Sequence, residues 1–149
     1  MGANAVPRYT ATANNGFALV DAANTNSDGT GNITTPTMYL LVTAGANGTL
    51  LNFVRCMVSA TTAASSNNPT VIRLYLSTIS SGATTNANTH LIAEQQIPSI
   101  TADQTVTSTP YFDIPLGMDI PSGYTLLAST HVVAASNTHN SVSAFADDF

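Results

Sequence analysis

From Thr37 to the C-terminus, the sequence alternates between short runs of β-branched and aromatic residues and clusters of turn-forming residues. This spacing is typical of an all-β sandwich or barrel. No stretch repeats its apolar residues with a helical period, and the helix-favouring residues Lys, Glu and Arg are nearly absent. We therefore expect an all-β, jelly-roll-like antiparallel β-sandwich. The predicted strands span residues 16–20, 37–42, 49–59, 70–78, 90–97, 105–114, 124–133 and 141–145.

Two of these runs predict how their strands are buried. Leu50 to Val58 is largely apolar on both faces, which predicts a central strand that is covered on both sides. Val71 to Thr78 alternates, which predicts one inward and one outward set of side chains. The inward set is Ile72, Leu74 and Leu76, and the outward set is Arg73, Tyr75 and Ser77. Asn47-Gly48 favours a hairpin turn between two strands.

The 149 residues suit a single domain with a lead-in segment. Residues 1–15 are small and polar without sustained alternation, so we interpret them as an irregular N-terminal arm, and residues 16–149 as one β-sandwich domain. The single cysteine, Cys56, has no internal disulfide partner and is expected to be buried. The N-terminus has no apolar h-region, so we expect no signal peptide and synthesis in a reducing cytoplasm.

Charged residues make up only 7% of the chain, against roughly 25% in an ordinary soluble domain. There is no lysine, and three arginines face eight acids, for a net charge of −5. Because no basic patch can form, we expect neither direct nucleic-acid binding nor a polybasic membrane contact. The apolar runs are also far shorter than the ~20 residues that span a bilayer.

No pattern of residues predicts catalysis or a bound cofactor. His90 is expected to be exposed, His131 lies in an apolar run typical of a core or interface, and His139 is eight residues further on, outside the usual metal-ligand spacings. Strand carboxylates such as Glu94 and Asp113 leave one alternative, a small hydrolase with a paired-carboxylate site. We expect no enzyme, no cofactor and no metal.

Two local motifs leave further alternatives. Asn24-x-Asn26-x-Asp28-Gly29 is similar to the start of a calcium loop, but its twelfth position is Thr35 instead of a bidentate Glu, so a metal is not expected there. At the C-terminus, two aromatic residues flank two acids in residues 145–149. This end is either a frayed tail after the last strand or a short hook that packs against a neighbouring chain.

Several segments resemble small all-β virion proteins of tailed phages, particularly the head decoration (cement) proteins. The similar segments are Thr43-Ala44-Gly45-Ala46-Asn47-Gly48-Thr49, Ile72-Arg73-Leu74-Tyr75-Leu76, Ala93-Glu94-Gln95-Gln96-Ile97-Pro98, residues 120–130 and Asp147-Asp148-Phe149. The resemblance covers residues 37–149 and rests on the order of strand and turn segments. It implies a non-enzymatic homotrimer that binds the major capsid protein on the outer surface of the virion capsid.

The low charge is compatible with such an assembly role, because neutral strand faces can be buried with little desolvation cost. The contacts with the shell or with neighbouring subunits are predicted to involve Pro7, Arg8, Tyr9, Phe145 and Phe149. The alternative function is a receptor- or glycan-binding module of a phage tail fibre or spike. Its aromatic platforms would be Tyr75, Tyr111 and Tyr124.

Overall fold

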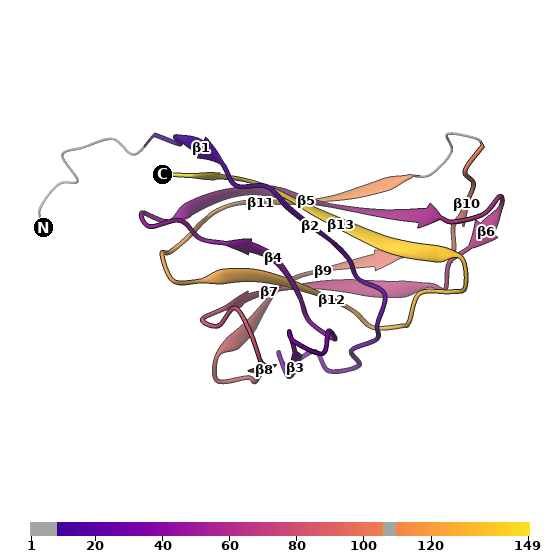
Figure 1. The fold of residues 1–149 in the computed structure, drawn as a ribbon, viewed down its shortest axis with the longest axis horizontal. Helices are drawn as coiled ribbons and strands as arrows, with labels where there is room; N and C mark the ends of the chain where they lie inside the picture. The colour runs from indigo at the N-terminus through magenta and orange to yellow at the C-terminus, as the bar shows by residue number, and fades with distance from the viewer. Residues whose placement is uncertain (1–8, 106–109) are drawn as a thin grey trace, which may run out of the picture.

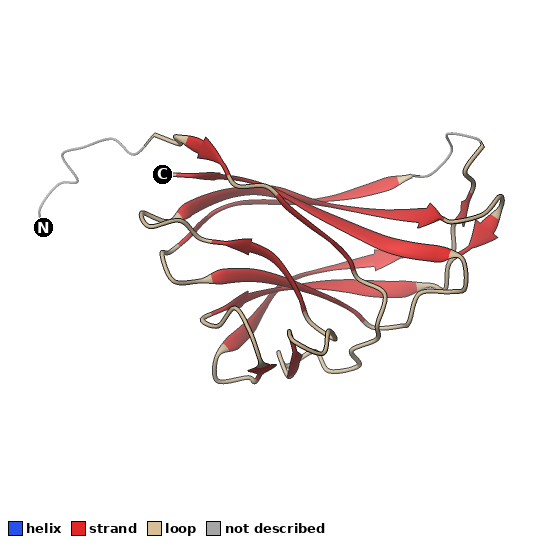
Figure 2. Ribbon diagram, in the orientation of Figure 1, coloured by secondary structure: helices blue, strands red, loops and turns tan. Residues whose placement is uncertain are grey.

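The strands account for all regular secondary structure in the part of the chain that can be described. The computed structural model describes residues 9–105 and 110–149. Within these ranges there are thirteen strands and no helix (Figure 2), which confirms the all-β prediction. The eight longest strands form two antiparallel sheets that lie one above the other (Figure 1).

Each of the two main sheets has four long strands. The first sheet has the order β2 (Gly16–Leu19), β13 (Thr138–Asp148), β5 (Thr49–Ala60), β11 (Tyr111–Ile120), and β1 (Thr12–Ala13) also pairs with β13. The second sheet has the order β4 (Tyr39–Thr43), β12 (Thr125–Thr130), β7 (Thr70–Ser77), β9 (Thr89–Ile97). Two short ribbons pair β3 (Gly31–Asn32) with β8 (Ala83–Thr84) and β6 (Ser65–Ser66) with β10 (Thr101–Ala102).

The order of the long strands shows how the chain builds the sandwich. Every connection between successive long strands crosses from one sheet to the other, except the one from β7 to β9. Every pairing between the long strands is antiparallel. This order is consistent with the predicted jelly-roll-like sandwich.

The core between the sheets is built from aliphatic side chains. It includes Val54, Leu74, Leu126 and Val142, together with the free thiol of Cys56. Burial raises the pKa of the Cys56 thiol to about 12, in agreement with the expected buried cysteine. All five phenylalanines fall within the described ranges, and none of them belongs to this fully buried set.

The prediction for residues 50–58 is correct in position and wrong in burial. As predicted, β5 is a central strand, with β13 on one side and β11 on the other. Phe53 pairs with Phe145 and Leu51 pairs with Ala146, so Asn52 is an extra residue in a β-bulge. The bulge turns Leu51, not Leu50, toward the core. The other face of β5 has no covering layer within the described part of the chain.

The second sheet, in contrast, has a cover on its outer face. Arg73 and Tyr75 point away from the main core, as predicted, yet both are buried. The segment between β2 and β4 folds over them and encloses a second small core of Met38, Tyr75 and Leu127, with Ile33 against it. The short strand β3 of this segment lies below the second sheet in Figure 1.

Candidate assembly surface

The outer face of the first sheet presents large side chains in three rows across its strands. One row is Leu19, Ser141, Met57 and Tyr111; the next is Phe17, Ser143, Arg55 and Asp113; the third is Phe145, Phe53 and Pro115. We call the set Phe17, Leu19, Phe53, Met57, Tyr111 and Phe145, with the central Arg55 and Asp113, the outer aromatic face.

The hydrophobic members of this face are accessible to solvent. Phe17 is 82% exposed and Tyr111 is 57% exposed, while Leu19 and Met57 are also exposed. Phe53 and Phe145 stack on each other with their ring centres 4.5 Å apart. Three of the five phenylalanines therefore lie on the solvent side of one sheet, although a monomer would gain more stability by placing them in its core.

An ion pair neutralises the centre of the outer aromatic face. Arg55 donates from Nε and Nη2 to the two carboxylate oxygens of Asp113, both at 2.8 Å. The Arg55 guanidinium also lies 4.1 Å from the centre of the Tyr111 ring, within the range of a cation–π contact. The hydrogen bonds from Arg55 hold the pKa of Asp113 below its ordinary value, and Asp113 raises the pKa of Arg55. Both groups stay charged at neutral pH, and their charges cancel.

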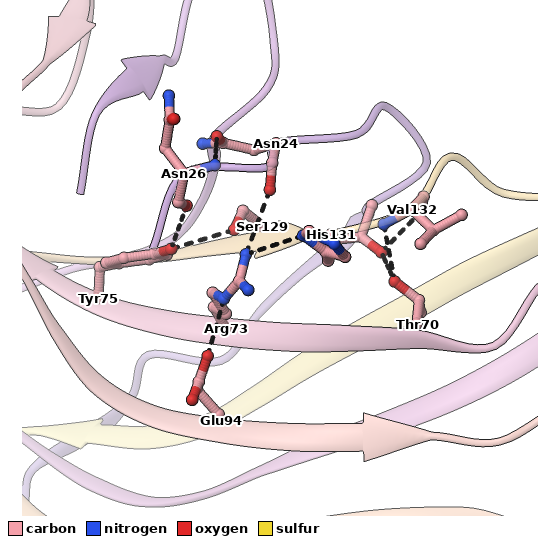
Figure 3. Close-up of polar contacts among 10 residues, drawn as sticks. Asn24, Asn26, Thr70, Arg73, Tyr75, Glu94, Ser129, His131 and Val132 are labelled. Atoms are coloured by element: carbon pink, nitrogen blue, oxygen red, sulfur yellow. Dashed lines mark hydrogen bonds and ion pairs between the residues drawn. The ribbon is translucent and has the colours of Figure 1, made fainter. Parts of the chain in front are cut away.

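A similar pair lies on the outer face of the second sheet, under the covering segment (Figure 3). Arg73 donates from Nε to Glu94 at 2.8 Å and from Nη1 to the backbone carbonyl of Asn24 at 3.3 Å. The Tyr75 hydroxyl donates to the backbone carbonyl of Asn26 at 3.3 Å. Burial raises the pKa of this hydroxyl. The polar side chains of this face therefore bind the covering segment of the same chain.

The two outer faces thus have related chemistry and different environments. Each has an arginine paired with a carboxylate on the neighbouring strand, and a tyrosine within two residues of that pair. On the second sheet, residues of the covering segment satisfy these groups. On the first sheet, no described segment of the chain does so.

The two candidate carboxylates of the hydrolase alternative lie on different sheets. Glu94 projects from the outer face of the second sheet and Asp113 from that of the first, and each is bound to its own arginine. In residues 9–105 and 110–149, no three His, Cys, Asp or Glu side chains come together as metal ligands. The structure therefore does not bring Glu94 and Asp113 together as a catalytic pair.

The segment that is similar to a calcium loop uses its oxygens for its own backbone. Asn24 Oδ1 accepts the N–H of Asn26 at 3.0 Å, and Asp28 Oδ1 accepts the N–H of Thr30 at 2.9 Å. The hydrogen bonds from Thr30 lower the pKa of Asp28. The spacing of Asn and Asp residues is accounted for by turn formation.

The three histidines occupy three separate places. His90 is exposed, as predicted. His131 follows the end of β12 and is half-buried, with Nδ1 3.5 Å from Nη1 of Arg73, so it does not belong to the main core. His139 Nδ1 contacts one carboxylate oxygen of Asp21, while the other accepts the N–H of Asn140 at 3.0 Å.

The predicted contact residues at the two ends of the chain lie in different environments. Pro7 and Arg8 lie outside the described residues. Tyr9 is 78% exposed. Phe145 belongs to the outer aromatic face, and Phe149 is half-buried, with its N–H donating to the carbonyl of Gly48 at 3.2 Å. Because β13 continues to Asp148, the frayed-tail alternative is wrong.

Most of the outer aromatic face could not be recognised in the sequence. Phe17 and Leu19 lie in a short predicted strand, and Phe53 and Met57 lie in a strand predicted to be covered on both sides. One signal was present in the sequence, because Phe17 and Leu19 alternate with the small residues Gly16 and Ala18. In a two-layer sandwich, the small residues of such a strand can face inward and the large ones outward.

Comparison with known proteins adds no relative to these observations. No protein-family model matches the chain, and no curated protein matches it either. A search for membrane spans among the described residues finds no helix long and apolar enough to cross a bilayer.

Proposed function

We propose that this protein is a non-enzymatic structural component of a tailed-phage virion, which decorates and stabilises the capsid by binding the major capsid protein as a homotrimer. The observation that carries the proposal is the outer aromatic face. An assembly role explains why the large aromatic side chains lie outside the core, because they gain their burial only when another chain covers them.

The composition of this face favours a protein partner. Aromatic residues, Met and Arg are enriched in the centres of protein–protein interfaces, whereas Lys and Glu are depleted. The outer aromatic face contains Phe, Tyr, Met and Arg, and its one acid, Asp113, is paired with Arg55. Because Arg55 is already paired with Asp113, covering the face does not bury an unpaired charge.

The capsid assignment itself rests on the resemblance of residues 37–149 to decoration proteins. The sandwich is compatible with this role, because its rigid β-sheets present a preformed surface with little conformational entropy to lose on binding. The site would act by burying area, with no chemical turnover, on the outer surface of the capsid.

Most of the tyrosine rings that the glycan-binding alternative requires are not accessible as aromatic platforms. Tyr75 is completely buried and Tyr124 is half-buried. Tyr111 is exposed, but the Arg55 guanidinium lies over its ring. A glycan array with the whole chain separates the two functions, because a capsid protein is expected to give no saturable binding at micromolar concentrations.

The direct test is co-sedimentation of the purified full-length protein with heads of the phage that encodes it. The heads are stripped of their outer proteins, and untreated heads serve as the matched control. We expect saturable binding to stripped heads and little additional binding to untreated heads. If the protein does not bind stripped heads even in large excess over the capsid protein in the heads, the capsid proposal is overturned.

A further inference from the structure

We infer that the outer aromatic face is a self-association interface, and that its occupant is a second copy of this chain. The inference deepens the proposed assembly function by naming the partner of this surface. It does not require the capsid to be the final target.

The outer side of the first sheet is large enough for a stable contact. The strands β13, β5 and β11 are 11, 12 and 10 residues long, and β2 adds a fourth strand at the edge. With strands about 4.8 Å apart and about 3.3 Å per residue, this whole side covers on the order of 600 Å² in projection, of which the three rows of the outer aromatic face occupy about half. A specific interface buries at least roughly 500 Å² on each partner, so a stable contact extends beyond these rows onto the rest of the sheet.

The distribution of charge also favours a second copy. The chain carries a net charge of −5, so two copies repel each other when their acidic surfaces approach. On the outer aromatic face, the charge of Asp113 is cancelled by Arg55. Two copies that meet through the three rows of this face bring together surfaces without net charge, while Asp119 and Asp147 lie in a further row of the same sheet, beside Leu50.

The relief of the face is complementary to itself. Ser141 and Ser143 form a strip of small side chains along β13, between the exposed Phe17 and Leu19 on one side and Met57 on the other. The large side chains of one copy can therefore pack over the serine strip of its neighbour. A contact of this kind buries Phe17 and Tyr111, which have the largest exposed fractions on the face.

The outer face of the second sheet is an example, within the same chain, of a similar face that is covered by polypeptide. There, the covering segment buries Tyr75 and Leu127 and provides backbone carbonyls to Arg73 and Tyr75. The first sheet offers equivalent side chains, and the described part of the chain supplies no cover for them. A second copy of the chain would supply the cover that the described residues do not.

The test is the mass of the full-length protein in solution, measured by analytical ultracentrifugation from about 0.1 to about 100 μM. The variant is Phe17→Ser, which removes an exposed ring from the edge of the face. Val133→Ser is the matched control, because Val133 is 55% exposed and lies outside the first sheet. Thermal unfolding of each variant reports whether the sandwich is intact, and Tyr111→Ser is a second variant of the face.

We expect the wild type and Val133→Ser to form an oligomer of defined size. Phe17→Ser should raise the dissociation constant by at least about 30-fold, which corresponds to about 2 kcal/mol for an aromatic ring that becomes buried on association. A wild-type monomer at about 100 μM overturns the inference, as does unchanged association of both Phe17→Ser and Tyr111→Ser. If Phe17→Ser unfolds, the Tyr111→Ser result decides.

These outcomes can be told apart from those of the capsid test. A wild-type monomer that still binds stripped heads contradicts self-association, and with it the homotrimer, and leaves capsid binding standing. A defined oligomer that does not bind stripped heads supports self-association and contradicts the capsid assignment.

Discussion

Arg55 on β5 binds both carboxylate oxygens of Asp113 on the neighbouring strand β11, and its guanidinium also lies against the ring of Tyr111. This arrangement places a fully paired cation in the middle of an exposed aromatic surface. It explains how a face rich in phenylalanine can contain charged groups and still be covered by another chain.

Replacing Asp113 with Asn should therefore weaken association more than folding. Arg55 would lose its counter-ion on a half-exposed surface, which water can compensate in the free protein but a covering chain cannot. We expect roughly a tenfold or greater rise in the dissociation constant, with a small change in Tm. Ultracentrifugation and thermal unfolding of Asp113→Asn measure the two effects, and an equal loss of both would argue against a buried interface.

The stability of the fold should fall in acid, and Asp148 should contribute to that fall. Thr49 donates a hydrogen bond to Asp148 Oδ1, and Asn14 donates another at 2.7 Å, so the pKa of Asp148 lies below its ordinary value. A carboxyl with a lowered folded-state pKa binds fewer protons when folded than when unfolded. Its stabilisation is thus present above the unfolded pKa of about 3.9 and is lost as the pH falls through the lowered value.

We expect Asp148→Asn to reduce the dependence of Tm on pH between about pH 5 and about pH 2. The loss of Tm at pH 7 should be larger than the loss at pH 2, because the stabilisation by the wild-type carboxylate declines as the pH falls below about 3.9. A variant whose Tm stays below that of the wild type by the same amount at both pH values would show that Asp148 acts only by packing.

Gly16 is predicted to tolerate no side chain. A Cβ built on Gly16 would lie 1.6 Å from the backbone carbonyl oxygen of Leu41, where β2 passes close to β4. Gly16→Ala must move one of these strands, at a cost of about 3 kcal/mol or more. At Gly82, a Cβ would meet no atom within 4 Å, although its φ is +80°. Gly82→Ala should cost only about 1 kcal/mol, and urea unfolding of both variants gives the comparison.

Arg73 should hold the covering segment on the second sheet. Arg73 is 8% exposed, and its side chain donates both to Glu94 and to the backbone carbonyl of Asn24. Arg73→Met keeps much of the volume and removes the donors, so we expect a loss of about 1–3 kcal/mol. Hydrogen exchange should increase in residues 20–38 more than in β5. Uniform acceleration throughout the sandwich would mean that Arg73 supports the whole fold instead of this segment.

The strands that could be predicted from the sequence are those with a clear period and a clear turn. The alternation of β7 identified its two faces correctly, and the position of β5 at the centre of a sheet was also correct. The strand predicted at residues 105–114 is instead observed from Tyr111 to Ile120 in the described chain. Pro115 and Gly117 are residues that normally end a strand, so the sequence does not predict that the strand continues beyond them. In the structure it does continue, because a bulge between Pro115 and Met118 accommodates these residues.

The exposed face could not be predicted in the same way. Alternation shows that a strand has two faces, but the covering layer depends on contacts between distant parts of the chain. Residues 21–36 have the composition of a loose polar loop, yet they cover Tyr75 and Leu127, while the more apolar outer side of β5 is uncovered. Similarly, the bulge at Asn52 depends on the register with β13 and leaves no mark in the local sequence.

The most direct test of an assembly surface is the number of copies that bind to each stripped head, measured for the wild type, Phe17→Ser and Val133→Ser. We expect saturable binding of the wild type and of Val133→Ser. A folded Phe17→Ser should lose most binding, because it cannot form the homotrimer that binds the capsid. Equal occupancy by all three proteins would contradict the role of the outer aromatic face, and absence of binding by the wild type would contradict the capsid assignment itself.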